Sequence, residues 1–108
     1  LRKIWTRHPE NWQHDTIPNS IEFTNAAPQE ILTELKQRNT QNTALLGGTE
    51  TYTSFLQANL VDELWLTLEP RLFGSGKKLA TGTLDTTFTH TETQHLSPNT
   101  LLLKYKKA

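Results

Sequence analysis

The chain has 108 residues, the size of one domain, and we therefore predict a single domain over residues 1–108. Its 11 basic residues balance its 11 acidic residues, so the net charge gives no reason to expect a nucleic-acid or membrane partner. The absence of cysteine excludes disulfides, thiolate nucleophiles and cysteine-based metal sites, and it favours a cytoplasmic protein. The hydrophobic share of 34% is low for a globular domain and the first residue is Leu1, which together suggest a piece of a larger protein.

The first part of the chain predicts two short strands and a helix. The strands are indicated by β-favouring residues around Trp5 and by the alternation of Ile21 and Phe23 with polar neighbours. The helix begins at Pro28, which suits a first turn because no N–H group is needed there. The predicted elements are a strand over residues 2–6, a loop over 8–19, a strand over 20–24 and a helix over 28–38.

The second part predicts a strand, a helix, another strand and a terminal hairpin. A short apolar run precedes Gly47 and Gly48, and apolar residues at helical spacing follow the glycine pair directly. Pro70 ends a run of alternating leucines, and a Ser-Pro-Asn turn joins the last two strands. These elements are a strand over residues 43–46, a helix over 49–59, a strand over 61–69 and hairpin strands over 86–94 and 100–106. Their order predicts an α/β fold with a mostly parallel sheet, flanking helices and a C-terminal antiparallel hairpin.

The glycine pair is the most informative place in the sequence. Gly47 and Gly48 would let a ligand approach the backbone without a Cβ in the way, and the first N–H groups of the next helix favour a phosphate group. The complete dinucleotide-binding and Walker patterns are absent. From these residues alone, a plain tight turn and an anion site both remain open.

The sequence from Leu45 to Leu79 resembles the reductase family that contains dihydrofolate reductase and the C-terminal domain of the bacterial riboflavin-pathway deaminase-reductase. The shared features are the Gly-Gly turn, the Leu-Val-Asp-Glu-Leu stretch over residues 60–64 and the Pro-x-Leu-x-Gly-x-Gly-Lys turn that starts at Pro70. The last strand, over residues 99–105, is also similar. The resemblance implies a dihydrofolate reductase-like fold of which this chain lacks the N-terminal part.

The resemblance also implies an NADPH-dependent oxidoreductase that acts as a 5-amino-6-(5-phosphoribosylamino)uracil reductase and forms a homodimer. The cofactor pyrophosphate is expected over the Gly-Gly turn and the following helix, and the adenosine 2′-phosphate at the end of the first strand, where an arginine fork suits phosphate. Leu46 stands at the substrate position, where reductases of this pathway carry a carboxylate. The implied cofactor-binding residues are Thr6, Arg7, Gly47, Gly48, Thr49, Glu50 and Thr51.

Two other functions remain open at this point. One is a pteridine reductase of the dihydrofolate reductase type. The other is a non-catalytic assembly module that keeps the sheet and the dimer surface, supported by Leu46 and by the missing N-terminal part. From the residues alone, Arg7 is equally a solvated loop cation. No catalytic residue is predicted, and the four scattered histidines give no reason to expect a metal site.

Overall fold

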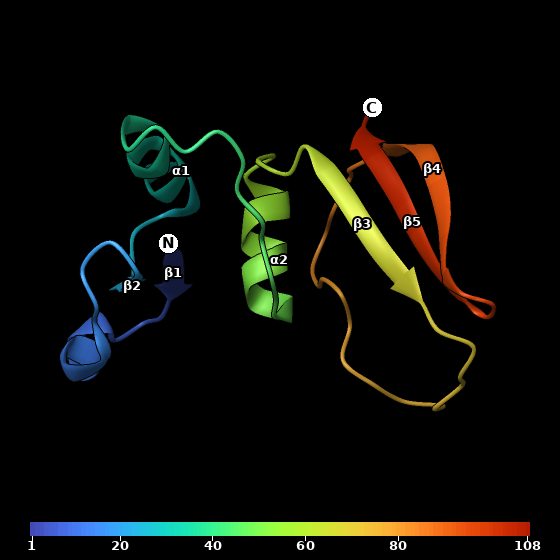
Figure 1. The fold of residues 1–108 in the computed structure, drawn as a ribbon, viewed down its shortest axis with the longest axis horizontal. Coiled ribbons are helices and arrows are strands. Elements are labelled where there is room, and N and C mark those ends of the chain that lie inside the picture. The colour runs from blue at the N-terminus through green and yellow to red at the C-terminus, as the bar shows by residue number, and fades with distance from the viewer. The chain divides into compact units, whose positions relative to one another are not determined.

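A computed structural model describes residues 1–108 (Figure 1). The chain divides into two compact units, Leu1–Ala44, called unit 1, and Leu45–Ala108, called unit 2. Neither unit contains a helix that is long and apolar enough to cross a membrane. In chain order the elements are β1 (Arg2–Trp5), the 3-10 helix η1 (Pro9–Asp15), β2 (Ile21–Thr24), α1 (Pro28–Gln37), α2 (Thr49–Gln57), β3 (Glu63–Leu68), β4 (Phe88–Ser97) and β5 (Thr100–Lys107).

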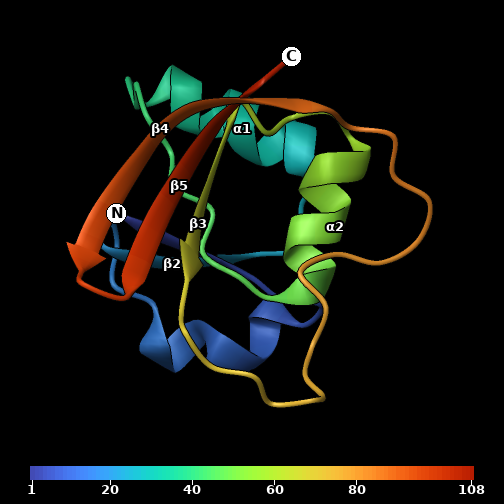
Figure 2. The ribbon, with the colours of Figure 1, turned by 90° about the vertical axis from the view of Figure 1, so that its right-hand side faces the viewer.

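Unit 1 is built on a two-stranded parallel sheet. β1 and β2 pair so that Lys3 lies opposite Glu22 and Ile4 lies opposite Phe23. One face of the pair packs against η1, where the ring of Trp12 stacks on Phe23 with the ring centroids 5.8 Å apart. Figures 1 and 2 show α1 on the other side of the strands from η1. The two strands are therefore covered on both faces, as is usual for parallel pairing.

The predicted strands and helix of unit 1 are confirmed within one residue at their ends. α1 begins at Pro28 and buries Ile31 and Leu35, which lie one turn apart on the same helix face. The predicted loop over residues 8–19 differs, because it contains η1. Short 3-10 turns form without an apolar period, and η1 buries none of its residues, so the sequence pattern carries no signal for it.

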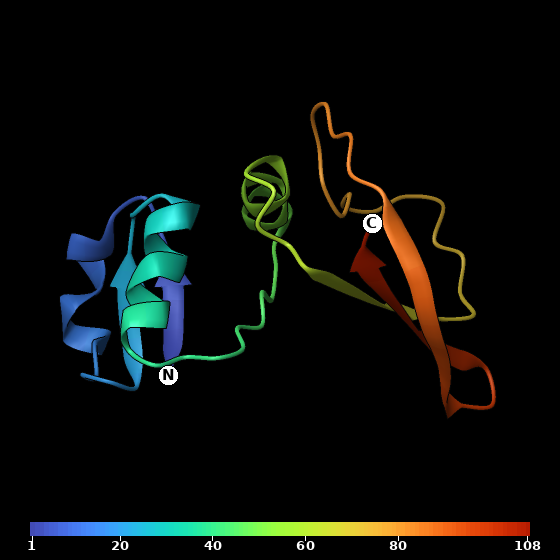
Figure 3. The same cartoon turned by 90° about the horizontal axis from the view of Figure 1, so that it is seen from above.

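Unit 2 contains α2 and a three-stranded antiparallel sheet in the order β3-β5-β4 (Figures 1 and 3). β5 is the central strand, and Pro98 and Asn99 form the two-residue turn that joins it to β4. The predicted strand over residues 61–69 and the terminal hairpin are confirmed, and β4 runs to Ser97, three residues beyond its expected end. The α/β fold class is confirmed, with parallel pairing between β1 and β2 and antiparallel pairing in the sheet of unit 2.

A row of three side chains crosses the sheet of unit 2 on one face. Trp65 of β3 lies opposite Lys104 of β5, whose ammonium nitrogen is 4.3 Å from the centroid of the Trp65 ring. The same ammonium group is 3.2 Å from a carboxylate oxygen of Glu92 on β4. The other face of β3 and β5 carries the apolar and aromatic side chains of Leu64, Leu66, Leu68, Leu101, Leu103 and Tyr105.

The predicted strand over residues 43–46 is wrong. Residues 41–48 contain no helix or strand, and the side chain of Leu46 is 86% exposed. An apolar run becomes a strand only where another strand supplies the hydrogen-bond partners of its backbone, and neither sheet includes this segment. The next element is as predicted, since α2 starts at Thr49 with Gly48 as its N-cap.

Candidate functional site

The Gly47-Gly48 turn leads directly into α2. Gly47 has a φ of 69°, a conformation that side chains disfavour, and the peptide bond to Gly48 is cis. Gly48 has an ordinary φ of −88°, and a Cβ added to it would meet no heavy atom within 4 Å. The space above the backbone of Gly48 is therefore open to a ligand.

The first turn of α2 adds a preference for anions. The first N–H groups of a helix lack acceptors within the helix, and the helix dipole places partial positive charge at that end. The first N–H group that donates within α2 belongs to Tyr52 and bonds to the carbonyl of Gly48 over 2.9 Å. The N–H groups of Thr49, Glu50 and Thr51 precede that bond, next to the open glycine turn. This arrangement suits a phosphate or pyrophosphate group.

Residues 69–87, which we call the strap, connect β3 to β4 without a helix or strand and run along α2 (Figure 2). Three α2 residues spaced by four contact the strap, so the contacts fall on one face of the helix. Two are hydrogen bonds, in which the hydroxyl of Thr49 donates to a carbonyl and the hydroxyl of buried Thr53 accepts from an N–H group over 2.9 Å. The third residue, Gln57, lies beside Gly82, where an added Cβ would be 3.2 Å from the amide nitrogen of Gln57. In order, the contacts join Thr49 to Lys78, Thr53 to Thr81 and Gln57 to Gly82.

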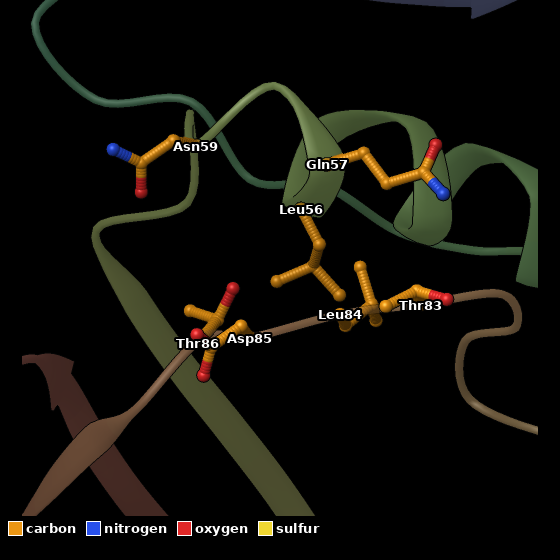
Figure 4. Close-up of a pocket in the computed structure, with 7 residues that line it drawn as sticks. All are labelled: Leu56, Gln57, Asn59, Thr83, Leu84, Asp85 and Thr86. Atoms are coloured by element: carbon orange, nitrogen blue, oxygen red, sulfur yellow. The ribbon is translucent and has the colours of Figure 1, made fainter.

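An open pocket of about 310 Å³ lies where the other end of α2 meets the strap (Figure 4). Its side chains of Leu56 and Leu84 point toward one another, and the remaining lining is polar. The glycine turn and the first turn of α2 do not line it, so the pocket is separate from the predicted cofactor residues. Its lining residues are Leu56, Gln57, Asn59, Thr83, Leu84, Asp85 and Thr86.

The remaining predicted cofactor residues, Thr6 and Arg7, lie in unit 1 directly after β1. The N–H group of Thr6 donates to the carbonyl of Thr24 over 2.9 Å, which continues the pairing of the parallel strands by one residue. The side chain of Arg7 is exposed at this carboxyl end of the sheet. The structure thus brings Thr6 and Arg7 together in unit 1, and residues 47–51 together in unit 2.

A network of four charged residues joins β1, β2 and α1, and we call it the ion network. Glu22 accepts hydrogen bonds from Lys3 over 2.8 Å and from both terminal nitrogens of Arg38 over 2.7 and 3.1 Å. Glu34 pairs with Lys3 over 2.7 Å and more loosely with Arg38 over 3.4 Å. This network was not predicted, because its members lie on three separate elements and no local pattern in the sequence pairs them.

The hydrogen bonds of the ion network change the acidity of its members. The Arg38 guanidinium, followed by the Lys3 ammonium, lowers the pKa of Glu22 to about 2. Lys3 likewise lowers the pKa of Glu34. Burial alone would lower the pKa of Lys3, but its hydrogen bonds to the two glutamates outweigh burial and raise it. All four groups are therefore charged at neutral pH, and the network is a structural feature of unit 1.

Comparison with protein families decides which group the chain is part of. The family of the RibD C-terminal domain matches residues 4–102, nearly the whole sequence. The chain belongs to this family. The resemblance carried by the Gly-Gly turn and the strand after it is thereby confirmed, and the RibD C-terminal domain spans both units of the structure.

Two solved structures share the fold of this RibD C-terminal domain. A protein assigned to riboflavin biosynthesis from Shewanella sp. PV-4 matches 86% of the chain with a TM-score of 0.74 and 21% identity. A pyrimidine reductase-like protein from Corynebacterium diphtheriae matches 82% with a TM-score of 0.66 and 19% identity. The matches cover 55% and 38% of those two proteins, so this chain spans about half of their length or less. No curated protein matches the sequence.

Proposed function

We propose that this RibD C-terminal domain is the cofactor-binding part of an NADPH-dependent reductase that acts on a pyrimidine-linked substrate of riboflavin biosynthesis. Family membership supports a reductase-like role in that pathway. The observation that carries the proposal is the open backbone of Gly48 beside the first turn of α2. A Cβ would fill this space, so the turn fits a phosphate group that approaches the backbone closely.

NADPH supplies a hydride when it is bound, and the residues of this chain bind and orient it. In unit 2, the N–H groups of Thr49, Glu50 and Thr51 would hold the pyrophosphate, because they can donate hydrogen bonds at the positive end of the helix dipole. By the resemblance, Arg7 of unit 1 is the residue that would hold the 2′-phosphate, because a guanidinium can donate to two phosphate oxygens at once. Orientation of this kind lowers the entropic cost of bringing the nicotinamide to the substrate.

The predicted substrate position carries an apolar side chain in this chain, that of Leu46. Its side chain is 86% exposed and has no polar atom, so it can contact a substrate but cannot accept a hydrogen bond from a ribose hydroxyl. We propose that apolar contact replaces a polar one at this position. Leu46→Asp would then tighten binding of a ribose-bearing substrate and leave the affinity for NADPH unchanged, as measured by separate titrations.

The proposed cofactor site is tested by titrating the chain with NADPH and following the amide signals of residues 47–51 by NMR. We expect these signals to shift, and we expect Gly48→Val to weaken binding at least tenfold because its side chain occupies the open space above the turn. Gly76→Val is the matched control, since Gly76 also has open space and no positive φ but lies outside the site. Gly47 is unsuitable, because any other residue would be strained at its φ of 69°.

The titration has two outcomes that contradict the proposal. One is that millimolar NADPH leaves the amides of residues 47–51 unshifted. The other is that Gly48→Val binds NADPH as tightly as Gly76→Val does. Circular dichroism of both variants shows whether their secondary structure is intact, so that lost binding is not mistaken for lost folding.

Leu46 also favours a second function, a non-catalytic assembly module. Such a module would keep the sheet and the dimer surface but would have lost catalysis, in line with the apolar side chain at the substrate position. A hydride-transfer assay that follows NADPH consumption separates the two functions. Consumption in the presence of the ribosylaminopyrimidine substrate supports the reductase, and no consumption supports the module.

A further inference from the structure

The strap and the proposed cofactor site share one chemical group, the hydroxyl of Thr49. This hydroxyl donates its hydrogen to the carbonyl of Lys78 in the strap. A hydroxyl has one hydrogen to donate, whereas the oxygens of a pyrophosphate are acceptors and need donors. Thr49 is the first residue of α2, beside the N–H groups that suit an anion. The Lys78 carbonyl and a bound phosphate therefore compete for the same donor.

We propose that the hydrogen bond between Thr49 and Lys78 is a latch that holds the strap on α2 in the free chain and opens when a phosphate oxygen accepts the Thr49 hydroxyl. This inference rests on the proposed function, because the phosphate is that of the dinucleotide at the glycine turn. Opening the latch couples occupancy of the cofactor site to the mobility of a segment that lies 29 residues further along the chain.

The contacts on either side of the latch define which residues move. The strap is held at its start, where the hydroxyl of Thr100 donates to the Glu69 carboxylate over 3.0 Å. It is held again at Thr81, whose N–H group donates to the buried Thr53, away from the first turn of α2. Between these two points, the hydroxyl of Thr49 donates to the carbonyl of Lys78 and ties residues 70–78 to α2.

The residues between the two fixed points offer little resistance to movement. The side chains of Leu72 and Phe73 are 102% and 77% exposed, so moving them breaks little apolar contact, whereas Leu79 is 45% exposed and stays partly covered. Gly74 has a φ of 77°, and glycine gives the backbone the freedom to pivot there. We therefore expect loss of the Thr49 hydrogen bond to release residues 70–78.

The test uses ¹⁵N relaxation of the whole chain, free and with NADPH or with inorganic pyrophosphate. We expect order parameters of residues 74–78 near 0.85 in the free chain and below about 0.6 with either anion. Thr49→Val removes the hydrogen-bond donor and keeps the shape of the side chain. In this variant we expect the order parameters of residues 74–78 to be low without ligand and to fall no further when an anion binds. Thr49→Ser keeps the donor and behaves as the wild-type chain.

Two results would overturn the latch. One is that NADPH shifts the amides of residues 47–51 while the order parameters of residues 74–78 stay high. Alternatively, Thr49→Val in the free chain shows the same order parameters as Thr49→Ser. Failure of the proposed function looks different, because NADPH then leaves the amides of residues 47–51 unshifted. In that case the order parameters of the two Thr49 variants in the free chain still show whether the hydrogen bond to Lys78 holds the strap.

Discussion

Glu22 shows how one residue organises unit 1. Its carboxylate faces Lys3 from the neighbouring strand and Arg38 from the end of α1, while Glu34 of α1 shares both cations. The Glu22 side chain is 20% exposed, so solvent screens these pairs less than it screens pairs on an open surface. Because Lys3 and Glu22 are directly opposite in the parallel pair, a shift of one residue in register would separate them.

We expect Glu22→Gln to lower the free energy of unfolding by about 1 to 2 kcal/mol. The substitution removes the charge that satisfies Lys3 and Arg38 but leaves a side chain of the same size. Asp62→Asn is the control, because Asp62 is 89% exposed and its oxygen is 3.9 Å from Lys107. Urea denaturation measures the free energy of unfolding of both variants. An equal effect of the two substitutions would contradict the role given to Glu22.

The acidity of Glu22 also predicts a dependence on pH. Its pKa is lowered from 4.5 to about 2, so the folded chain binds this proton less readily than the unfolded chain does. The stability it contributes is fully present above about pH 4.5 and is lost as the pH falls toward 2. Urea midpoints between pH 6 and pH 2 should therefore fall less steeply for Glu22→Gln than for wild type, and parallel curves would refute this.

At the scale of elements, α1 illustrates how a short helix is stabilised by what it buries. A helix of 10 residues is marginal on its own in water, so its stability comes from packing. Ile31 and Leu35 are 5% and 6% exposed and form that packed face. Their spacing was visible in the sequence, which is why the position of α1 could be predicted.

We expect Leu35→Ala to lower the free energy of unfolding by about 2 to 4 kcal/mol, the usual cost of truncating a buried leucine. Leu46→Ala makes the same chemical change at a residue that is 86% exposed, and should alter stability by less than about 0.5 kcal/mol. Thermal denaturation followed by circular dichroism compares the two. Similar shifts of the melting temperature would mean that exposure does not distinguish the two leucines.

Elements with local signals were predictable from the sequence, and those that depend on distant partners were not. The starts of α1 at Pro28 and α2 at Thr49 follow from proline, the glycine pair and apolar spacing, all within a few residues. The segment 43–46 failed because an apolar run does not reveal whether another strand will pair with it. In the candidate site, the Gly-Gly turn was predictable, whereas the contact of Thr49 with the strap joins residues 29 apart.

At the scale of the whole molecule, the edges of the unit 2 sheet bear on assembly. β3 is an edge strand, so the outer side of its backbone has no partner strand. It also carries exposed apolar side chains, with Trp65 57% and Leu68 56% exposed. We propose that the protein forms a homodimer, as the family resemblance implies, and that the β3 edge contributes to it.

Sedimentation equilibrium tests the dimer directly. We expect a mass of twice 12.3 kDa for the wild-type chain. Leu68→Lys should shift the equilibrium toward monomer, because a lysine on an edge strand opposes pairing with a second strand. Leu96→Lys, at a residue of β4 that is 52% exposed, is the control. A wild-type monomer at 100 μM would contradict the proposal.

The placement of the three tryptophans makes each unit separately visible by fluorescence. Unit 1 holds Trp5, whose indole N–H donates to the carbonyl of Ala26 over 2.9 Å, together with Trp12 stacked on an aromatic ring. Unit 2 holds only Trp65, beneath an ammonium group. Emission from a chain with Trp65→Phe therefore reports on unit 1, and emission from a chain with Trp5→Phe and Trp12→Phe reports on unit 2. The two variants let a single optical experiment, without any attached dye, record whether the halves of the chain melt together or one after the other.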